Sequence, residues 1–268
     1  EKAKVDNLTN EQVAALKFHK AYGLFVEKKF SEAKPLFNAI RQITTDPNYI
    51  DANYYYGFIC FGEKQYKEAI RCFELIDEQP SYQTIVPYYI AQIDYIQGNK
   101  NKALQYAEKQ LAKGGQYYDL QLRQLVGHGY FEQKEFAKAL PYLETYIAKT
   151  PKVRREDLYE LAYCYYHSQQ YTKAIVGFKE LGGKDDSLAQ NSMYLLGDAY
   201  LKTDNKVNAR NAFLFCAQNS SVAIQKEVSQ FNYAKLSYEL GYQDIAINEF
   251  KSFITQYPKS RYNKEAKE

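Results

Sequence analysis

Small and large apolar residues recur along this chain at a nearly constant interval. The most regular mark is an alanine four residues before a large apolar residue, as in KQYKEAIRCF (64–73), KEFAKALPYL (134–143) and QQYTKAIVGF (169–178). Successive alanines are 34 to 37 residues apart, and the seven are Ala33, Ala69, Ala103, Ala139, Ala174, Ala209 and Ala246. Periods of this length are typical of repeat proteins.

A second small residue lies twelve residues before each of these alanines. It is glycine or alanine in all seven periods: Ala21, Gly57, Ala91, Gly127, Ala162, Gly197 and Ala234. Two small residues at fixed points let two helices approach closely, and the large residue one turn after the alanine fills the space beside them. Each period therefore predicts a helix, a short turn and a second, antiparallel helix.

This pattern resembles the tetratricopeptide repeat, whose signature is a small residue at repeat position 8, alanine at 20, an aromatic at 24 and often proline at 32. The resemblance covers nearly the whole chain and implies an all-α fold, an α-α superhelical solenoid of about seven helix-turn-helix repeats. One continuous array is expected over residues 1–268, with repeats that start near residues 14, 50, 84, 120, 155, 190 and 227. Residues 257–268 (YPKSRYNKEAKE) are expected to start a further or capping helix.

The third repeat departs most from this signature. It has Asp94 at position 11, and Ala107 stands at position 24 where the family has an aromatic residue. This repeat is therefore expected to pack loosely or to bend the superhelix.

The same resemblance indicates which residues face a partner. In this family the first helix of each hairpin lines a concave groove, and positions 2, 5, 9, 12 and 13 usually face it. Positions 5, 9 and 12 form one stripe on a helix, and positions 5 and 12 are aromatic in six of the seven repeats. The candidate groove residues are Phe18, Tyr22, Phe25, Tyr54, Phe58, Phe61, Tyr88, Tyr95, His128, Phe131, Tyr159, Tyr163, Tyr166, Tyr194, Phe231 and Tyr238.

Two interpretations of these rings stay open. The rings can pack between neighbouring first helices and stiffen the superhelix, or they can hold an extended or helical segment of a partner protein. Tyrosine suits the second role because it offers a large contact area at low entropic cost and keeps a hydrogen-bonding tip. Carbohydrate also stacks on tyrosine. Chaperone-binding members of the family clamp a terminal carboxylate with Lys and Asn, and the aromatic residues at position 5 argue against that clamp here.

Composition narrows the classes of partner. The chain has 268 residues with 28 Tyr, 15 Phe and no Trp, and its 35 basic and 32 acidic residues give a net charge of +3. These charges are scattered, so no basic block predicts nucleic acid or an anionic membrane as a partner. No run of 18 apolar residues predicts a membrane span.

The sequence carries none of the common catalytic or metal-binding motifs. The sequence has no phosphate-binding loop and no nucleophile elbow, and none of its three histidines has His or Cys three or four residues later. Cys164 and His167 are close in YCYYH, but nothing orients the imidazole. Asp185 and Asp186 are expected to mark a helix N-terminus and not a cation site. The chain is therefore expected to be no enzyme and to hold no metal or cofactor.

The four cysteines, Cys60, Cys72, Cys164 and Cys216, form no CxxC pair and match no zinc pattern. Buried free thiols are expected, which favours a reducing compartment. Against this, YPKSRYNKEAKE (257–268) and DANYYYGFICFGEKQYKEAI (51–70) are similar to repeats of bacterial cell-envelope members of the family, including outer-membrane assembly and division-coordinating lipoproteins. That resemblance implies a periplasmic or cell-envelope location, with the cytoplasm as the alternative.

The function expected from these features is a non-enzymatic scaffold for protein–protein interaction, which binds a protein or peptide segment in an aromatic-lined groove. The alternative is a structural arm of a larger, truncated multidomain protein whose activity lies outside this chain. Self-association through exposed solenoid ends is a third hypothesis.

Overall fold

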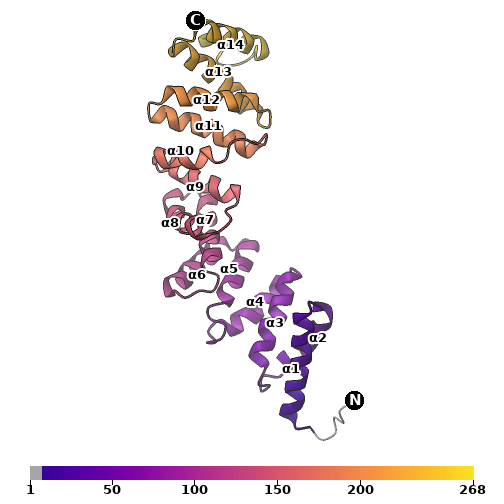
Figure 1. Cartoon of the computed structure of the whole chain (residues 1–268). Coiled ribbons are helices and arrows are strands. Elements are labelled where there is room, and N and C mark those ends of the chain that lie inside the picture. The colour runs from indigo at the N-terminus through magenta and orange to yellow at the C-terminus, as the bar shows by residue number, and fades with distance from the viewer. Residues whose placement is uncertain (1–7) are drawn as a thin grey trace. The chain divides into compact units, whose positions relative to one another are not determined.

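The chain folds into antiparallel helical hairpins. The computed structural model describes residues 8–268, which form fifteen helices and no strand (Figure 1). The all-α fold of successive helical hairpins that the repeat predicts is therefore confirmed. Contacts divide the chain into two compact units: unit 1 ends at Val126, and unit 2 begins at Gly127. The continuous array expected over residues 1–268 stays a prediction, and residues 1–7 lie outside the described part.

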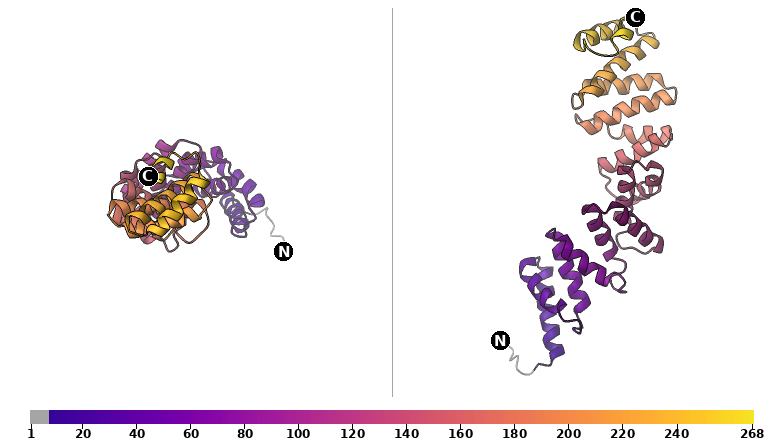
Figure 2. Two further views of the ribbon diagram at one scale, coloured as in Figure 1. Left: turned by 90° about the horizontal axis from the view of Figure 1, so that it is seen from above. Right: turned by 180° about the vertical axis from the view of Figure 1, so that it is seen from behind.

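Unit 1 consists of three hairpins followed by the first residues of α7. Within each hairpin the two helices pack together, and α2 packs on α3 and α4 on α5, so that neighbouring hairpins share an interface (Figure 2). The helices of unit 1 are α1 (Asn10–Val26), α2 (Phe30–Arg41), α3 (Tyr49–Gly62), α4 (Tyr66–Ile76), α5 (Val86–Ile96) and α6 (Lys100–Lys113).

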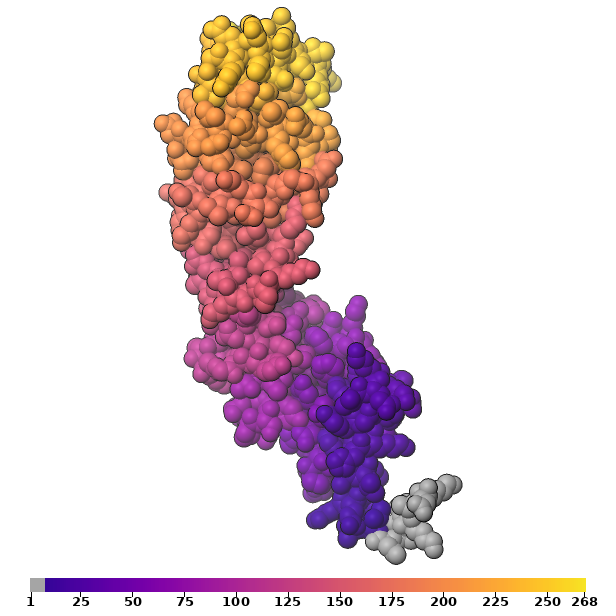
Figure 3. Space-filling model, viewed as in Figure 1, coloured from indigo at the N-terminus to yellow at the C-terminus, as the bar shows by residue number. Residues whose placement is uncertain are grey.

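Unit 2 begins within α7 (Asp119–Glu132) and repeats the same plan. Its consecutive helices from α8 to α15 pack on one another, and the space-filling view shows the atoms of its neighbouring hairpins in contact on this face (Figure 3). The further helices are α8 (Phe136–Lys149), α9 (Arg155–His167), α10 (Tyr171–Lys179), α11 (Ser187–Lys202), α12 (Lys206–Gln218), α13 (Ala223–Glu239), α14 (Gln243–Gln256) and α15 (Asn263–Lys267).

The small residues of the repeat permit the close approach of paired helices. A Cβ atom added to Gly57 would lie 3.0 Å from Phe73 Cε1, and one added to Gly197 would lie 2.8 Å from the same atom of Phe213. Both phenylalanines are almost completely buried. In the last hairpin, Phe253 is fully buried, whereas Phe250, which the repeat predicts for that place, is only partly buried.

Each hairpin turn contains one residue in the left-handed region, and it always lies five residues before the repeat alanine. Only two of these seven residues are glycine, although for other residues this conformation costs roughly 1 kcal/mol. The residues, with φ between 56° and 87°, are Lys28, Lys64, Gly98, Lys134, Gln169, Asp204 and Gly241.

The third repeat does not pack loosely. Asp94 is buried, and it accepts hydrogen bonds from Asn99 in the turn and from Lys102 on α6. Ala107 is also fully buried. The expectation of loose packing was therefore wrong, because Asp94 finds polar partners in its own hairpin turn and on α6. A bend of the superhelix at this repeat stays a prediction.

Candidate protein-binding surface

The sixteen candidate groove residues lie on the first helices of the hairpins, and they differ in exposure. Tyr22 and Tyr238 are exposed over 41% and 65% of their surface, whereas Phe231 is only 3% exposed. The other thirteen are partly buried. Most of these side chains therefore pack against the protein with part of the ring and leave the rest open to solvent.

In unit 1 the candidate rings pack across neighbouring hairpins. The Phe58 ring lies 5.5 Å from Phe25 of the preceding hairpin and 6.0 Å from Tyr89 of the following one, measured between ring centroids. The Tyr54 ring stacks on Tyr82 at 4.6 Å. Such ring pairs contribute roughly 0.5–1.5 kcal/mol each beyond their area burial. These rings thus stabilise the stacking of hairpins, as the packing interpretation requires.

Several tyrosines outside the repeat positions join these ring contacts, and among them Tyr82 is buried. Tyr82 precedes α5, and Tyr117 and Tyr118 precede α7; the Tyr118 ring lies 4.9 Å from Tyr88. Tyr117 is among the most exposed large hydrophobic side chains of the described residues. The repeat pattern does not reveal these residues because they lie in connecting segments, where no helical period applies. The excess of tyrosine in the composition was the one available signal.

In unit 2 the aromatic contacts are sparser and include histidine. The Tyr163 ring lies 5.7 Å from Tyr159 and 4.4 Å from His167, and Phe131 reaches Tyr163 at 5.5 Å. Burial lowers the pKa of His167. This imidazole therefore favours its neutral form, which suits its stacking on aromatic neighbours.

Phe231 is not available to a partner in this structure. Its ring stacks on Tyr262 at 4.6 Å and lies 5.7 Å from Phe253. The residue belongs to a buried cluster that also contains Ala266 of α15. The reason is that the C-terminal segment packs against the middle of α13, so position 5 of the last repeat becomes core.

Hydrogen bonds with carboxylates link first helices of successive repeats. His128 Nδ1 lies 2.7 Å from Glu160 Oε1, and Lys235 donates to Glu265 at 2.6 Å. The Glu160 hydrogen bond raises the pKa of His128, and Glu160 and Glu132 add Coulombic contributions, while burial opposes them.

Two tyrosine hydroxyls also donate to carboxylates of a neighbouring repeat, Tyr82 from the segment before α5 and Tyr166 from α9. Tyr82 donates to Asp51 and Tyr166 to Asp198, each at 2.5 Å. Burial and the Asp198 hydrogen bond raise the pKa of Tyr166, so its hydroxyl stays protonated and remains a donor.

Cys164 and Asp186, which superficially suggested a reactive thiol and a cation site, lie in structural settings. Cys164 is fully buried, and burial raises the pKa of its thiol to about 12, so no thiolate forms at neutral pH. Asp186 caps α11 by accepting a hydrogen bond from Ala189 N at 2.8 Å, and it pairs with Arg155 at 2.6 Å. The interpretation of Asp185–Asp186 as a helix start is thereby confirmed.

Further features of the described residues bear on the other sequence predictions. All four cysteines are buried and unpaired, as expected. Within residues 8–268, no group of three or more His, Cys, Asp and Glu side chains is placed to hold a metal ion. In the same part of the chain, every helix is too short or too polar to cross a membrane.

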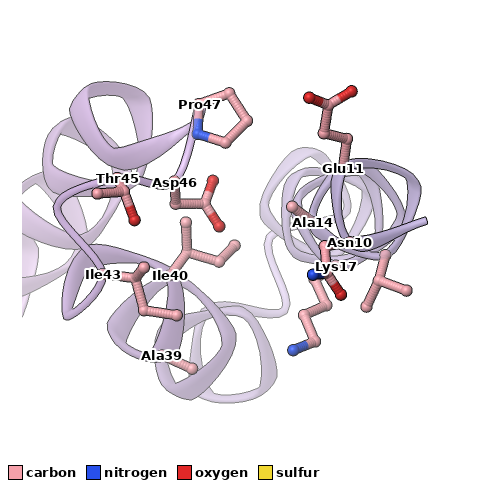
Figure 4. Close-up of a pocket in the computed structure, with 11 residues that line it drawn as sticks. Asn10, Glu11, Ala14, Lys17, Ala39, Ile40, Ile43, Thr45, Asp46 and Pro47 are labelled. Carbon is pink, nitrogen blue, oxygen red and sulfur yellow. The ribbon is translucent and has the colours of Figure 1, made fainter.

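Cavities occur near both ends of the chain. One of about 440 Å³ lies beside α1 in unit 1, where Ala14 and Ile40 face each other across it (Figure 4). Another of about 650 Å³ lies against α13, α14 and α15 in unit 2, and its lining includes Tyr238, Ile247 and Phe250. Among the candidate groove residues, Tyr238 alone lines either of these two cavities.

Comparison with known proteins supports the repeat. Residues 229–260 match the family model of the tetratricopeptide repeat. No curated protein matches the chain. Among solved structures, the C-terminal part of a repeat-containing protein of this kind from Cytophaga hutchinsonii is 15% identical, with a TM-score of 0.59 over 93% of this chain and 98% of that one.

Two further solved structures are similar. A tetratricopeptide repeat protein from Parabacteroides merdae is 14% identical, with a TM-score of 0.53 over 95% of this chain and 97% of that one. YrrB, described as a protein of this kind with an unusual peptide-binding site, is 13% identical, with a TM-score of 0.56 over 70% of this chain and 94% of that one. At these identities the likeness is one of fold.

Proposed function

We propose that this chain, which has the tetratricopeptide repeat fold, is a non-enzymatic scaffold that binds a segment of a partner protein on the aromatic surface of its first helices. Proteins with this fold generally mediate protein–protein interaction, and the family is generally non-catalytic. Each unit carries its own aromatic surface, so the proposal applies to each unit separately.

The observation that carries the proposal is the exposure of Tyr22 and Tyr238. Each ring lies on a first helix and leaves a large apolar area in water. No ring contact involves Tyr238 among the described residues, so packing between repeats does not account for it. Exposed tyrosines are the kind of side chain that anchors a protein interface once a partner covers them.

Affinity capture from the native cell, with the double variant Tyr22→Ala/Tyr238→Ala, tests the proposal. Capture of a specific partner is expected from the unmodified chain and is expected to fall at least about tenfold in the variant, since buried tyrosine anchors contribute roughly 2 kcal/mol or more each. Tyr238 has no ring contact among the described residues, whereas Tyr22 contacts Phe18 and Tyr55, so the melting temperature is expected to fall only by the loss of these two ring pairs.

The matched control is Leu75→Ala/Val176→Ala. These residues lie on the second helices α4 and α10 and are exposed over 44% and 62% of their surface. The control is expected to retain capture. If both double variants lose partner capture equally, or both retain it equally, the aromatic surface does not bind the partner.

A location in the periplasm or cell envelope is part of this proposal and rests on the similarity of residues 51–70 and 257–268 to repeats of envelope proteins. The experiment is fractionation of native cells with an antibody against this chain. The chain is expected in the periplasmic or membrane fraction, and its recovery with cytoplasmic markers alone would favour the cytoplasmic alternative.

A further inference from the structure

In unit 1, a carboxylate lies among tyrosine rings. Asp51 is in the first turn of α3, and Tyr82 donates a hydrogen bond to its Oδ1 at 2.5 Å. Tyr54 and Tyr55 follow on the same helix three and four residues later, the spacing that brings side chains onto one face. Tyr22 of α1 completes the set, because its ring lies 5.4 Å from that of Tyr55. These five residues are called the Asp51 cluster.

Within the Asp51 cluster, Tyr54 stacks on Tyr82 at an interplanar angle of 25°, whereas Tyr55 meets two other rings at steep angles. Tyr22 and Tyr55 have an interplanar angle of 64°, and Tyr54 and Tyr55 have one of 74° at a centroid distance of 5.2 Å. Such edge-to-face pairs turn the negative faces of successive rings in different directions. Tyr22 is exposed, and Asp51, Tyr54 and Tyr55 are partly exposed, so a ligand can reach the cluster from solvent.

The charge of the Asp51 cluster is not neutralised within the described part of the chain. Asp51 forms no ion pair with any basic side chain of residues 8–268, and Tyr82 is its one hydrogen-bonding partner there. Some carboxylates of unit 1 do have cationic partners, as Asp94 has Lys102 and Asp119 has Arg123. The cluster therefore combines a net negative charge with electron-rich ring faces.

We propose that the Asp51 cluster binds a lysine or arginine side chain of the protein segment held by unit 1. A cation is attracted both to tyrosine faces and to a carboxylate, and the two attractions act together where the site is partly shielded from water. This inference rests on the proposed function and specifies its partner: a segment that presents a basic residue. A purely structural role for Asp51, at the positive end of the α3 dipole, would not require the exposed ring of Tyr22.

The test is a titration of the whole chain, labelled in its tyrosine rings, with tetramethylammonium chloride at constant ionic strength and observed by NMR. tert-Butanol serves as the neutral probe of similar shape. The ring signals of Tyr22 and Tyr55, assigned through Tyr→Phe variants, are expected to shift and saturate with tetramethylammonium and to stay nearly unchanged with tert-butanol. An N-terminally acetylated Gly-Gly-Lys-Gly-Gly amide is expected to act like tetramethylammonium, and its Nε-acetylated form, which carries no charge, is not.

Asp51→Asn is expected to weaken tetramethylammonium binding by about fivefold to tenfold, because the carboxylate contribution is lost while the rings remain. Glu32→Gln is the matched control, since Glu32 is also a first-turn carboxylate of unit 1, on α2, and is expected to leave binding unchanged. Tyr22→Leu, which removes the most exposed ring without touching Asp51, is expected to weaken binding as well. Circular dichroism checks that each variant is folded.

The outcomes separate this inference from the proposed function. Equal shifts with both probes, or equal affinity of the chain and Asp51→Asn, would overturn the cation site. If Asp51→Asn lowers only the melting temperature, its carboxylate stabilises α3 and binds no ligand. Loss of partner capture in Tyr22→Ala/Tyr238→Ala together with unchanged capture by Asp51→Asn would keep the scaffold and reject the basic partner. Asp51-dependent tetramethylammonium binding without any partner capture would reject the scaffold and keep the cation site.

Discussion

Replacement of Gln190 by methionine is expected to destabilise unit 2 by about 3 kcal/mol. Gln190 is fully buried on α11, and its side-chain amide holds the segment between α12 and α13. Its Nε2 donates to the carbonyl oxygens of Cys216 at 3.2 Å, Asn219 at 2.9 Å and Val222 at 3.1 Å, and its Oε1 accepts from Val222 N at 2.6 Å.

The magnitude follows from these bonds. The two amide hydrogens are shared among three carbonyl acceptors and count as about two full hydrogen bonds, and the bond that Oε1 accepts is a third. Each contributes a net of about 1 kcal/mol to stability. Methionine keeps the unbranched shape and removes every one of them. The buried Val222 N–H then has no acceptor, which destabilises the fold by a further 1–3 kcal/mol, roughly. Burial of the more apolar methionine side chain stabilises the fold by a similar amount, so the net loss stays at about 3 kcal/mol.

Urea unfolding measures the loss, and hydrogen exchange locates it. Exchange in residues 216–225 is expected to accelerate in Gln190→Met, because this segment loses its attachment to α11. Gln218→Met is the matched control, since Gln218 is an exposed residue at the end of α12. A free energy of unfolding within about 0.5 kcal/mol of that control, with unchanged exchange in 216–225, would refute the reasoning.

Three further predictions concern single residues. The pKa of His128 is raised in the folded chain, chiefly by its hydrogen bond to Glu160. The His128–Glu160 pair therefore stabilises unit 2 fully below the unfolded pKa of about 6.5, and this stabilisation is lost as the pH rises through the folded pKa. Unfolding measured at a series of pH values checks this, and His128→Gln is expected to reduce the dependence of the unfolding free energy on pH. Gly98→Ala is expected to lower stability by about 1 kcal/mol, because φ is 87° there, and an unchanged melting temperature would contradict that reason. Gly197→Ala is expected to lower the free energy of unfolding by roughly 1–3 kcal/mol, because the new Cβ would lie 2.8 Å from the Phe213 ring. If calorimetry finds no loss of stability, the phenylalanine ring moves aside without strain.

The repeat predicts the helical hairpins well because its marks are steric. A small residue such as Gly57 is required wherever the paired helix packs closely against that position. Small residues at a regular interval in the sequence therefore indicate that this close helix contact is repeated. The turn conformation left no comparable record. Lys28 and Lys64 adopt positive φ, which glycine would have signalled, and they do so because the hairpin geometry imposes it.

The sequence predicts which residues lie on the candidate surface, but it does not predict which of their side chains are exposed to solvent. Tyr22 and Phe231 both occupy stripe positions, yet one is exposed and the other is covered by Tyr262. Exposure depends on which neighbouring segment covers each ring, and here that segment is the C-terminal tail. The Asp51 cluster was equally beyond the repeat pattern, because Tyr82 reaches Asp51 from a connecting segment.

The most direct measurement of the central claim is the dissociation constant of the captured partner segment, determined by calorimetry for the chain and for Tyr22→Ala/Tyr238→Ala. The account predicts that the constant rises at least about tenfold in this variant, while the Leu75→Ala/Val176→Ala control keeps the original value and both variants keep the original fold. An identical constant for all three proteins would contradict the claim that the aromatic surface binds the partner.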